Sequence, residues 1–174
     1  YDGAPTSGYD ADRYNEGSLW EYTSAAYNLG TRVWAIEDVD GDGYDEMGVL
    51  EAGGGYAAYL WAGEEVTTDP AVNFPYIHTI TADAMSSGGD FEGDGGRTWM
   101  AGLPNYSSNT GVVYVYSGTT HEHSMVGEAT GDYAGGSVAG GAGMDVDGDG
   151  LDDMAVGAYG NDEGGSGSGA AYIV

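Results

Sequence analysis

Residues 38–49 read DVDGDGYDEMGV, and residues 145–156 read DVDGDGLDDMAV. Between them, residues 90–101 read DFEGDGGRTWMA, which is a less complete copy of the same pattern. The three copies begin 52 and 55 residues apart, and a small-residue turn and an aromatic segment follow each of them. A fixed period of this length is typical of repeat proteins in which every repeat is one supersecondary unit.

The segments around these copies have the alternation of β-strands. VWAIEDV (33–39), GVVYVYS (111–117) and GAAYIV (169–174) suit half-buried strands. AVNFPYIHTIT (71–81) and HSMVGE (123–128) are weaker candidates, which we expect to be outer strands. No stretch of helical length carries a convincing apolar stripe. We therefore predict an all-β protein with about four short antiparallel strands in each unit of roughly 53 residues, the size of one propeller blade.

The length of 174 residues predicts a single repeat domain, because it is too short for two domains of ordinary size. Its predicted units are a partial blade (1–32), a blade with the first acidic loop (33–84), a blade with a degenerate loop (85–138) and a blade with the last acidic loop (139–174). The chain starts at Tyr1 without an initiator methionine or a signal peptide, so we expect a mature or excised piece.

The composition is strongly acidic and rich in glycine. There are 29 acidic residues and 34 glycines, but only three arginines and no lysine, and the net charge is −26. Such a surface repels phosphate backbones and anionic membranes, so we expect no nucleic-acid partner. No stretch approaches eighteen apolar residues, so we expect no membrane insertion. Cysteine is absent, which excludes disulfides and thiol nucleophiles.

The acidic repeats have the residue types and spacing of a Ca²⁺ site. Carboxylates at positions 1, 3 and 5 converge on one point, because glycines at positions 4 and 6 let the backbone curl inward. Position 7 can add a backbone carbonyl and position 9 a further carboxylate. Hard oxygen ligands in this number suit Ca²⁺, which accepts six to eight of them in irregular geometry, better than Mg²⁺.

The candidate ligands fall into three sets, one for each loop. In the first loop (38–46) they are Asp38, Asp40, Asp42, the Tyr44 carbonyl and Glu46; in the last loop (145–153) they are Asp145, Asp147, Asp149, the Leu151 carbonyl and Asp153. In the middle loop (90–98) they are Asp90, Glu92, Asp94, Gly96 and Thr98, and we expect this site to be weaker. The middle loop either retains a weak site or is a metal-free turn held partly by Arg97.

An EF-hand is not predicted, although its first six positions match. The bidentate glutamate that it needs at position 12 is replaced by Val49 in the first loop and by Val156 in the last. The flanking segments also have the pattern of strands and not of helices.

The acidic loop, the short strand after it, and the triplets Gly157-Ala158-Tyr159 and Gly3-Ala4-Pro5 together resemble FG-GAP repeats, the blades of integrin-α-type β-propellers. Ala101-Gly102-Leu103-Pro104 is a looser version of the triplet. The resemblance covers about three units and implies that the acidic loop between the first two strands of each blade binds Ca²⁺. This chain also departs from the family pattern, because complete propellers of this kind have about seven blades and this chain has about three.

About three blades cannot close a conventional ring, so the sheets at both ends should expose an unpaired edge or face. The chain opens partway through one unit and closes after the aromatic strand of another, which favours completion of the last blade by another chain or segment. We therefore expect self-association into an oligomer or a filament, with a plain fragment of a larger propeller as the other reading.

Three further groups of residues carry weaker signals. Aromatic pairs at alternate positions, Tyr114 with Tyr116 and Tyr59 with Trp61, could be sugar platforms but are expected to pack between blades. His121 and His123 would share a strand face and could ligate a transition metal. Without a third partner at sensible spacing, we expect them in an exposed turn. Asn105 begins a glycosylation sequon.

The sequence therefore predicts an extracellular, calcium-binding structural protein that self-assembles. The alternative function is an adhesion or lectin-like module that recognises a glycan or a protein. No histidine or serine stands in a recognisable nucleophile setting, so we do not expect an enzyme. Weak modular calcium sites are filled at millimolar concentrations, which favours secretion or the cell surface over the cytosol.

Overall fold

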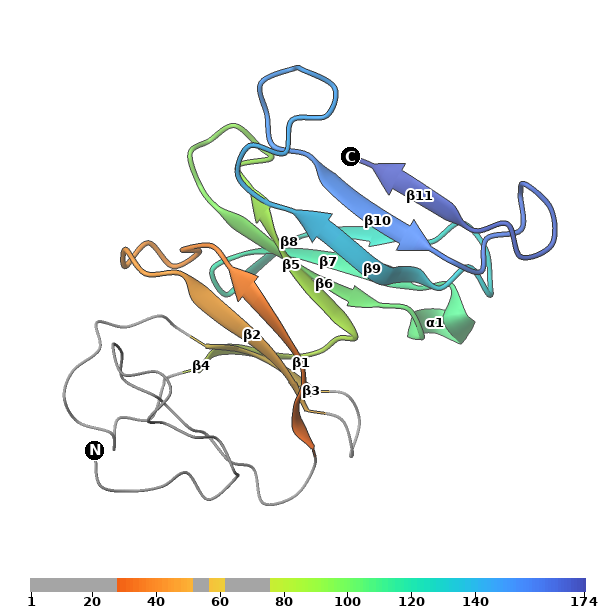
Figure 1. Cartoon of the computed structure of the whole chain (residues 1–174), viewed down its shortest axis with the longest axis horizontal. Helices are drawn as coiled ribbons and strands as arrows, with labels where there is room; N and C mark the ends of the chain where they lie inside the picture. Colours follow the sequence, from red (N-terminus) through yellow and green to blue (C-terminus); the bar gives the residue numbers. More distant parts are fainter. Residues whose placement is uncertain (1–27, 52–56, 62–75) are drawn as a thin grey trace, which may run out of the picture.

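The structure is a computed structural model that describes residues 28–51, 57–61 and 76–174. Within these residues the protein is nearly all β, with three antiparallel sheets and one short helix (Figure 1). This confirms the predicted fold class of incomplete propeller blades, since none of the sheets closes into a barrel. The predicted partial blade at 1–32 lies almost wholly outside the described residues.

Each sheet is a meander in which consecutive strands pair. The first contains β1 (Leu29–Ile36), β2 (Glu46–Glu51), β3 (Ala57–Trp61) and β4 (Tyr76–Thr81); the second contains β5 (Ala84–Gly89), β6 (Thr98–Leu103), β7 (Val112–Ser117) and β8 (Thr120–Val126). The third contains β9 (Ala134–Gly140), β10 (Met154–Ala158) and β11 (Ala170–Ile173). The short helix α1 (Tyr106–Asn109) connects β6 to β7.

The first two sheets have the four antiparallel strands expected of each blade. β4 and β8 are the outermost strands of their sheets, as expected for residues 71–81 and 123–128. The third sheet has three described strands where four were predicted. β1 begins at Leu29 and β9 at Ala134, a few residues before the predicted unit boundaries.

The first strands of the three sheets lie next to one another, and β5 contacts both β1 and β9 (Figure 1). The second sheet is therefore covered on both faces. Alternate side chains of a strand point to opposite faces, so β6 sends Trp99 and Ala101 towards the first sheet and Met100 towards the third. All three side chains are fully buried. This is why TWMAGL lacks the polar alternation of a half-exposed strand.

Two apolar cores result from this layering. The core between the first two sheets includes Ile36, Leu50, Leu60, Met85 and Trp99, and Tyr116 stacks on the Trp99 ring at 4.5 Å. The core between the second and third sheets consists of Met100, Val113, Val115, Met154 and Val156.

Glycine sets the spacing between the second and third sheets at one point. A Cβ atom on Gly102 of β6 would overlap the backbone carbonyl of Gly135 in β9. Gly135 itself has φ of +84°, a conformation that favours glycine. The two backbones can therefore approach only because neither residue carries a side chain.

None of the helices among the described residues is long and apolar enough to cross a membrane.

Candidate metal centres in the acidic loops

The first loop connects β1 to β2, and the carboxylate of Asp38 organises its backbone. Asp38 Oδ1 accepts a hydrogen bond from Gly41 N at 2.7 Å, and Oδ2 accepts one from Gly43 N at 2.9 Å. Both glycines have positive φ, which lets the chain curl around the aspartate. Asp40 Oδ1 accepts from Asp42 N at 3.1 Å and continues the same winding. The loop is thus a spiral of backbone N–H groups that face carboxylate oxygens.

The last loop, between β9 and β10, repeats this arrangement with the same partners. Asp145 Oδ1 accepts from Gly148 N at 2.6 Å and Oδ2 from Gly150 N at 3.1 Å. Asp147 Oδ1 accepts from Asp149 N at 3.0 Å. Two segments more than one hundred residues apart therefore have one conformation, because the same residue types stand at the same positions.

The carboxylate at position 9 lies beneath the loop in both cases. Glu46 is 2% exposed, and its Oε2 accepts from Val39 N at 2.6 Å. Asp153 is 7% exposed, and its Oδ2 accepts from Val146 N at 2.5 Å and from Asp147 N at 3.3 Å. These side chains hold the start of the loop to the first residues of the next strand.

The predicted ligands converge in the two complete loops. In the first loop, one oxygen from each of Asp38, Asp40, Asp42 and Glu46 lies within 4.8 Å of the others. In the last loop, Asp145, Asp147 and Asp149 meet the same limit; Asp153 is not in that group. Oxygens that share one Ca²⁺ at 2.3–2.6 Å are at most about 5 Å apart, so this donor set fits the ion.

The middle loop, between β5 and β6, keeps only part of this pattern. Asp90 Oδ2 accepts from Gly95 N at 3.1 Å, and Asp94 Oδ1 accepts from Gly96 N at 2.7 Å. Glu92 instead reaches out of the loop to His123. Thr98 is buried, and its hydroxyl donates to Gly89 O at 3.0 Å. Of the five residues predicted as ligands here, the structure does not bring the three acidic ones together.

One oxygen in the middle loop still has the character of a ligand. Among the described residues, Asp90 Oδ1 is buried and accepts no hydrogen bond. A carboxylate oxygen in that position is costly unless a donor or a cation meets it. The middle loop therefore retains one buried carboxylate oxygen that a cation could meet.

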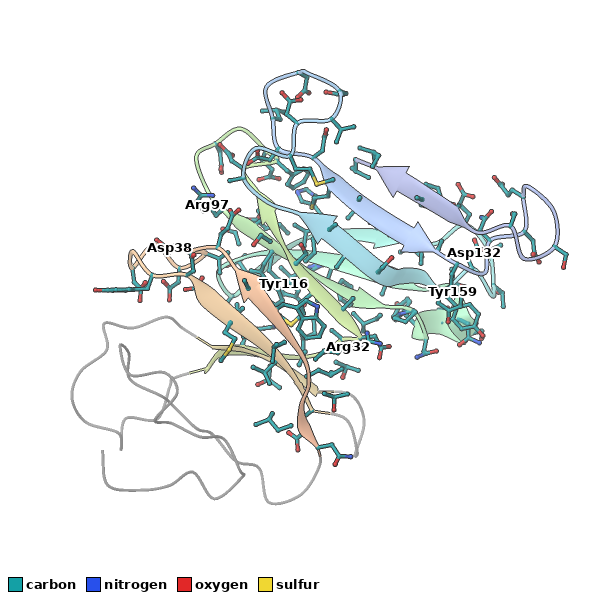
Figure 2. All side chains as sticks on the ribbon, viewed as in Figure 1. Arg32, Asp38, Arg97, Tyr116, Asp132 and Tyr159 are labelled. Carbon is teal, nitrogen blue, oxygen red and sulfur yellow. The ribbon has the colours of Figure 1, made fainter. Side chains whose placement is uncertain are left out.

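Arg97 does not hold its own loop in the way the sequence suggested. Its guanidinium forms an ion pair with Glu37 at 2.5 Å, just before the first loop, and Glu37 also accepts from Ala142 N at 2.6 Å. Asp152 makes a second connection, accepting from Asp90 N at 2.8 Å and from Gly143 N at 2.6 Å. The three loops therefore lie at one end of the sheets and are joined to one another (Figure 2).

Sequence reasoning missed Glu37 and Asp152 as connecting residues. Both stand beside predicted ligands, Glu37 before position 1 and Asp152 at position 8. No local pattern distinguishes a carboxylate that will face a neighbouring sheet from one that will face solvent.

The aromatic pair in the second sheet packs as predicted. Tyr116 is buried in the core, and Tyr114 is half-buried against it. The side chains of Tyr59 and Trp61 lie outside the described residues. Asn105 is exposed just before α1, where a glycan could be attached, and its glycosylation stays a prediction.

The expectation for the two histidines is wrong. His121 and His123 lie in strand β8 and not in a turn. Their rings also meet different neighbours: His121 contacts Tyr114 and Tyr116, while His123 contacts Glu92 and Phe91.

Two residues with shifted pKa values lie away from the acidic loops, near the contact between the first two sheets. Burial lowers the pKa of His78, whose ring lies 5.7 Å from Trp99 and 5.0 Å from Tyr116. Burial also raises the pKa of Asp83, and the nearby Arg32 partly opposes this shift. These shifts follow from packing, and none of them indicates an acid–base pair.

Layered antiparallel blades, each with an acidic loop after its first strand, define a β-propeller-like repeat protein. The family model of the FG-GAP repeat matches residues 135–174, which contain β10, β11, most of β9 and the last loop. The match confirms the family resemblance for the last unit.

Proposed function

We propose that this chain is a calcium-stabilised structural protein of the extracellular space, built from β-propeller blades and able to self-assemble. The observation that carries the proposal is the shared conformation of the first and last loops. Each brings three or four carboxylate oxygens within 4.8 Å of one another at the end of a sheet. The Mg²⁺ alternative is weaker, because such irregular oxygen sets suit the larger ion.

Calcium would supply positive charge where the chain concentrates negative charge. Two carboxylates about 4 Å apart repel each other by roughly 1 to 4 kcal/mol, depending on their exposure to water. Asp38, Asp40, Asp42 and Glu46 would hold one ion, and Asp145, Asp147 and Asp149 would hold another, with the Tyr44 and Leu151 carbonyls and Asp153 as further candidates. Because Glu37 and Asp152 join the loops, an ordered loop also stabilises the packing of neighbouring sheets.

The type of calcium site supports an extracellular location. Sites made of surface loops are filled where calcium is millimolar, as it is outside cells. Two or three bound ions would leave most of the net charge of −26 in place, which favours solubility.

The third sheet supports self-assembly. Its described strands number three, and β11 ends the sheet order with Ile173 and Val174 about half exposed. A fourth strand from another chain or segment would pair with this edge and cover those side chains. Filaments or rings in negative-stain microscopy with millimolar calcium, lost with excess chelator, are the expected result. A compact monomer in both conditions would refute assembly.

Calcium binding is tested by calorimetric titration and by thermal unfolding of the whole chain. We expect at least two sites in the wild type and the loss of one in each of Asp38→Asn and Asp145→Asn. Asp45→Asn is the matched control, because Asp45 is an exposed acid of the first loop outside the convergent group.

The order of the unfolding temperatures of Asp38→Asn and the wild type should reverse when calcium is added. Without calcium, Asp38→Asn relieves repulsion and is at least as stable as the wild type. With calcium it is less stable. Equal calcium stabilisation of Asp38→Asn, Asp145→Asn and Asp45→Asn would contradict the assignment of the ligands.

One observation favours the alternative of an adhesion module. Tyr133 and Tyr159 stack at 4.8 Å with an interplanar angle of 13°, and Tyr159 is 63% exposed. An exposed aromatic face of this kind can stack on a sugar ring. Glycan-array binding that Tyr159→Ala abolishes, together with a discrete oligomer, would favour this function over the structural one.

A further inference from the structure

A second kind of metal-ligating cluster lies outside the three loop sites. Glu92, Glu122 and His123 each place one ligand atom within 4.8 Å of the other two. His123 Nε2 is 2.5 Å from Glu92 Oε1, and all three side chains are accessible to solvent. Glu92 comes from the middle loop and the other two from β8, so the cluster joins two segments about thirty residues apart.

An irregularity in β8 brings the two neighbouring residues to one point. Val115 pairs with His123 and Tyr116 with His121, so Glu122 is the extra residue of a β-bulge. In a regular strand, adjacent side chains point to opposite faces of the sheet. A bulge changes that direction locally and can aim two successive side chains at one site. Glu122 can therefore bind the same ion as His123, although regular alternation along a strand would place His123 on the same face as His121.

Packing holds the imidazole in place. The ring of His123 meets the ring of Phe91 edge to face, with centroids 5.5 Å apart and an interplanar angle of 86°. Phe91 itself packs against the core between the second and third sheets. The ligand nitrogen is thus positioned by an aromatic residue fixed in the fold, which lowers the entropy lost when a metal binds.

We propose that Glu92, Glu122 and His123 form a zinc site, distinct in chemistry from the oxygen-only calcium loops. One imidazole nitrogen and two carboxylate oxygens are ligands that Zn²⁺ takes at about 2.0–2.2 Å, with water completing four-coordination. Tetrahedral ligands at that distance are roughly 3.4 Å apart. The His123–Glu92 contact must therefore open by about 1 Å, which the exposed glutamate can accommodate by rotation.

The site has a consequence for the middle loop, because Glu92 stands at position 3 of that loop. While Glu92 faces His123, it does not join Asp90 and Asp94 as a third acidic ligand. Zinc at the β8 site holds Glu92 in this orientation. The contact between Glu92 and His123 already keeps the acidic residues of the middle loop from converging, and bound zinc would reinforce it.

The test is a titration of the whole chain with Zn²⁺ alone as the probe, in millimolar calcium and physiological salt so that other carboxylates are occupied or screened. We expect one site in the wild type. His123→Ala and Glu92→Gln should weaken it by about tenfold or more. His121→Ala is the matched control, since His121 lies on the same strand but outside the cluster, and it should retain wild-type affinity.

A second measurement needs no variant. In nuclear magnetic resonance spectra of the wild type, zinc should shift the ring signals of His123 and leave those of His121 and His78 in place. Equal zinc affinity in His123→Ala and the wild type, or shifts at His121 instead of His123, would overturn the proposal. The absence of any zinc binding would overturn it as well, and would leave Glu92 and His123 as an ion pair.

Discussion

The complete loops and the middle loop begin with the same sequence pattern but end in different structures. In the first and last loops, position 1 accepts two backbone hydrogen bonds and position 9 anchors the loop from beneath. In the middle loop, Thr98 replaces the anchoring carboxylate and Glu92 turns to His123. After these two changes the acids of the loop no longer converge, and Glu92 instead contacts another strand of the same sheet.

The difference teaches that an acidic loop can serve a blade in two ways. It can concentrate charge for a cation, or it can distribute its acids to partners in the protein. Glu92 illustrates the second way, because its carboxylate contacts His123 of β8.

Removal of calcium should have the largest effect and should act only on the complete loops. Two sites, each at a ten- to hundredfold excess of calcium over Kd, stabilise the folded chain by about 3 to 5 kcal/mol. Hydrogen exchange with and without chelator should show lost protection at residues 38–46 and 145–153, and little change at 90–98. Equal loss of protection in all three loops would contradict the prediction that the middle loop differs from the other two.

Thr98→Glu should convert the middle loop towards the complete type. The substitution removes the hydrogen bond from the Thr98 hydroxyl to Gly89 O and buries a carboxylate in its place. Without calcium, it should therefore lower the free energy of unfolding by about 1 to 3 kcal/mol. Calcium should restore that stability, and the number of calcium ions bound per chain should rise. Thr98→Gln, with the same size and no charge, is the control and should not respond. Thermal unfolding with and without calcium measures both variants.

Breaking the connection between the loops should lower the free energy of unfolding by less than the removal of calcium does. Glu37→Ala removes the contacts to both Arg97 and Ala142 N, and we expect a loss of about 1 to 2 kcal/mol. Arg97→Ala removes only the ion pair, whose partners are 44% and 27% exposed, and should cost about 0 to 1 kcal/mol. Chemical denaturation in chelator measures both. A larger loss for Arg97→Ala would contradict this order.

The smallest effect should come from His78, a half-buried residue of β4 outside the acidic loops that packs against Trp99 and Tyr116. Burial lowers its pKa in the folded chain below the ordinary value of 6.5. The unfolded chain therefore binds more protons just below pH 6.5, and stability is lost as pH falls through that window. His78→Phe should lose less stability than the wild type between pH 7 and pH 5.5, in chelator as in calcium. Identical pH profiles of stability for His78→Phe and the wild type would show that His78 makes no such contribution.

Much of the fold could be predicted because its signals are local. The period of the acidic loops located three sheets, and alternation placed β7 and β11 and marked β4 and β8 as outer strands. The two complete loops were predictable in detail for the same reason. The hydrogen bonds that the carboxylates at positions 1 and 9 accept within these loops join residues at most seven positions apart.

Residue types and their spacing are enough to set the local conformations of this protein: strands, glycine-permitted turns, and the curl of the chain around Asp38 and Asp145. The tertiary structure sets which groups distant in the sequence meet. Glu37 meets Arg97 and Asp152 meets Asp90 where neighbouring sheets stack, and Glu92 meets His123 within the second sheet, although each pair is at least 31 residues apart. Local propensity carries no information about such pairs, because they depend on the stacking of the blades and on the order of strands within a sheet.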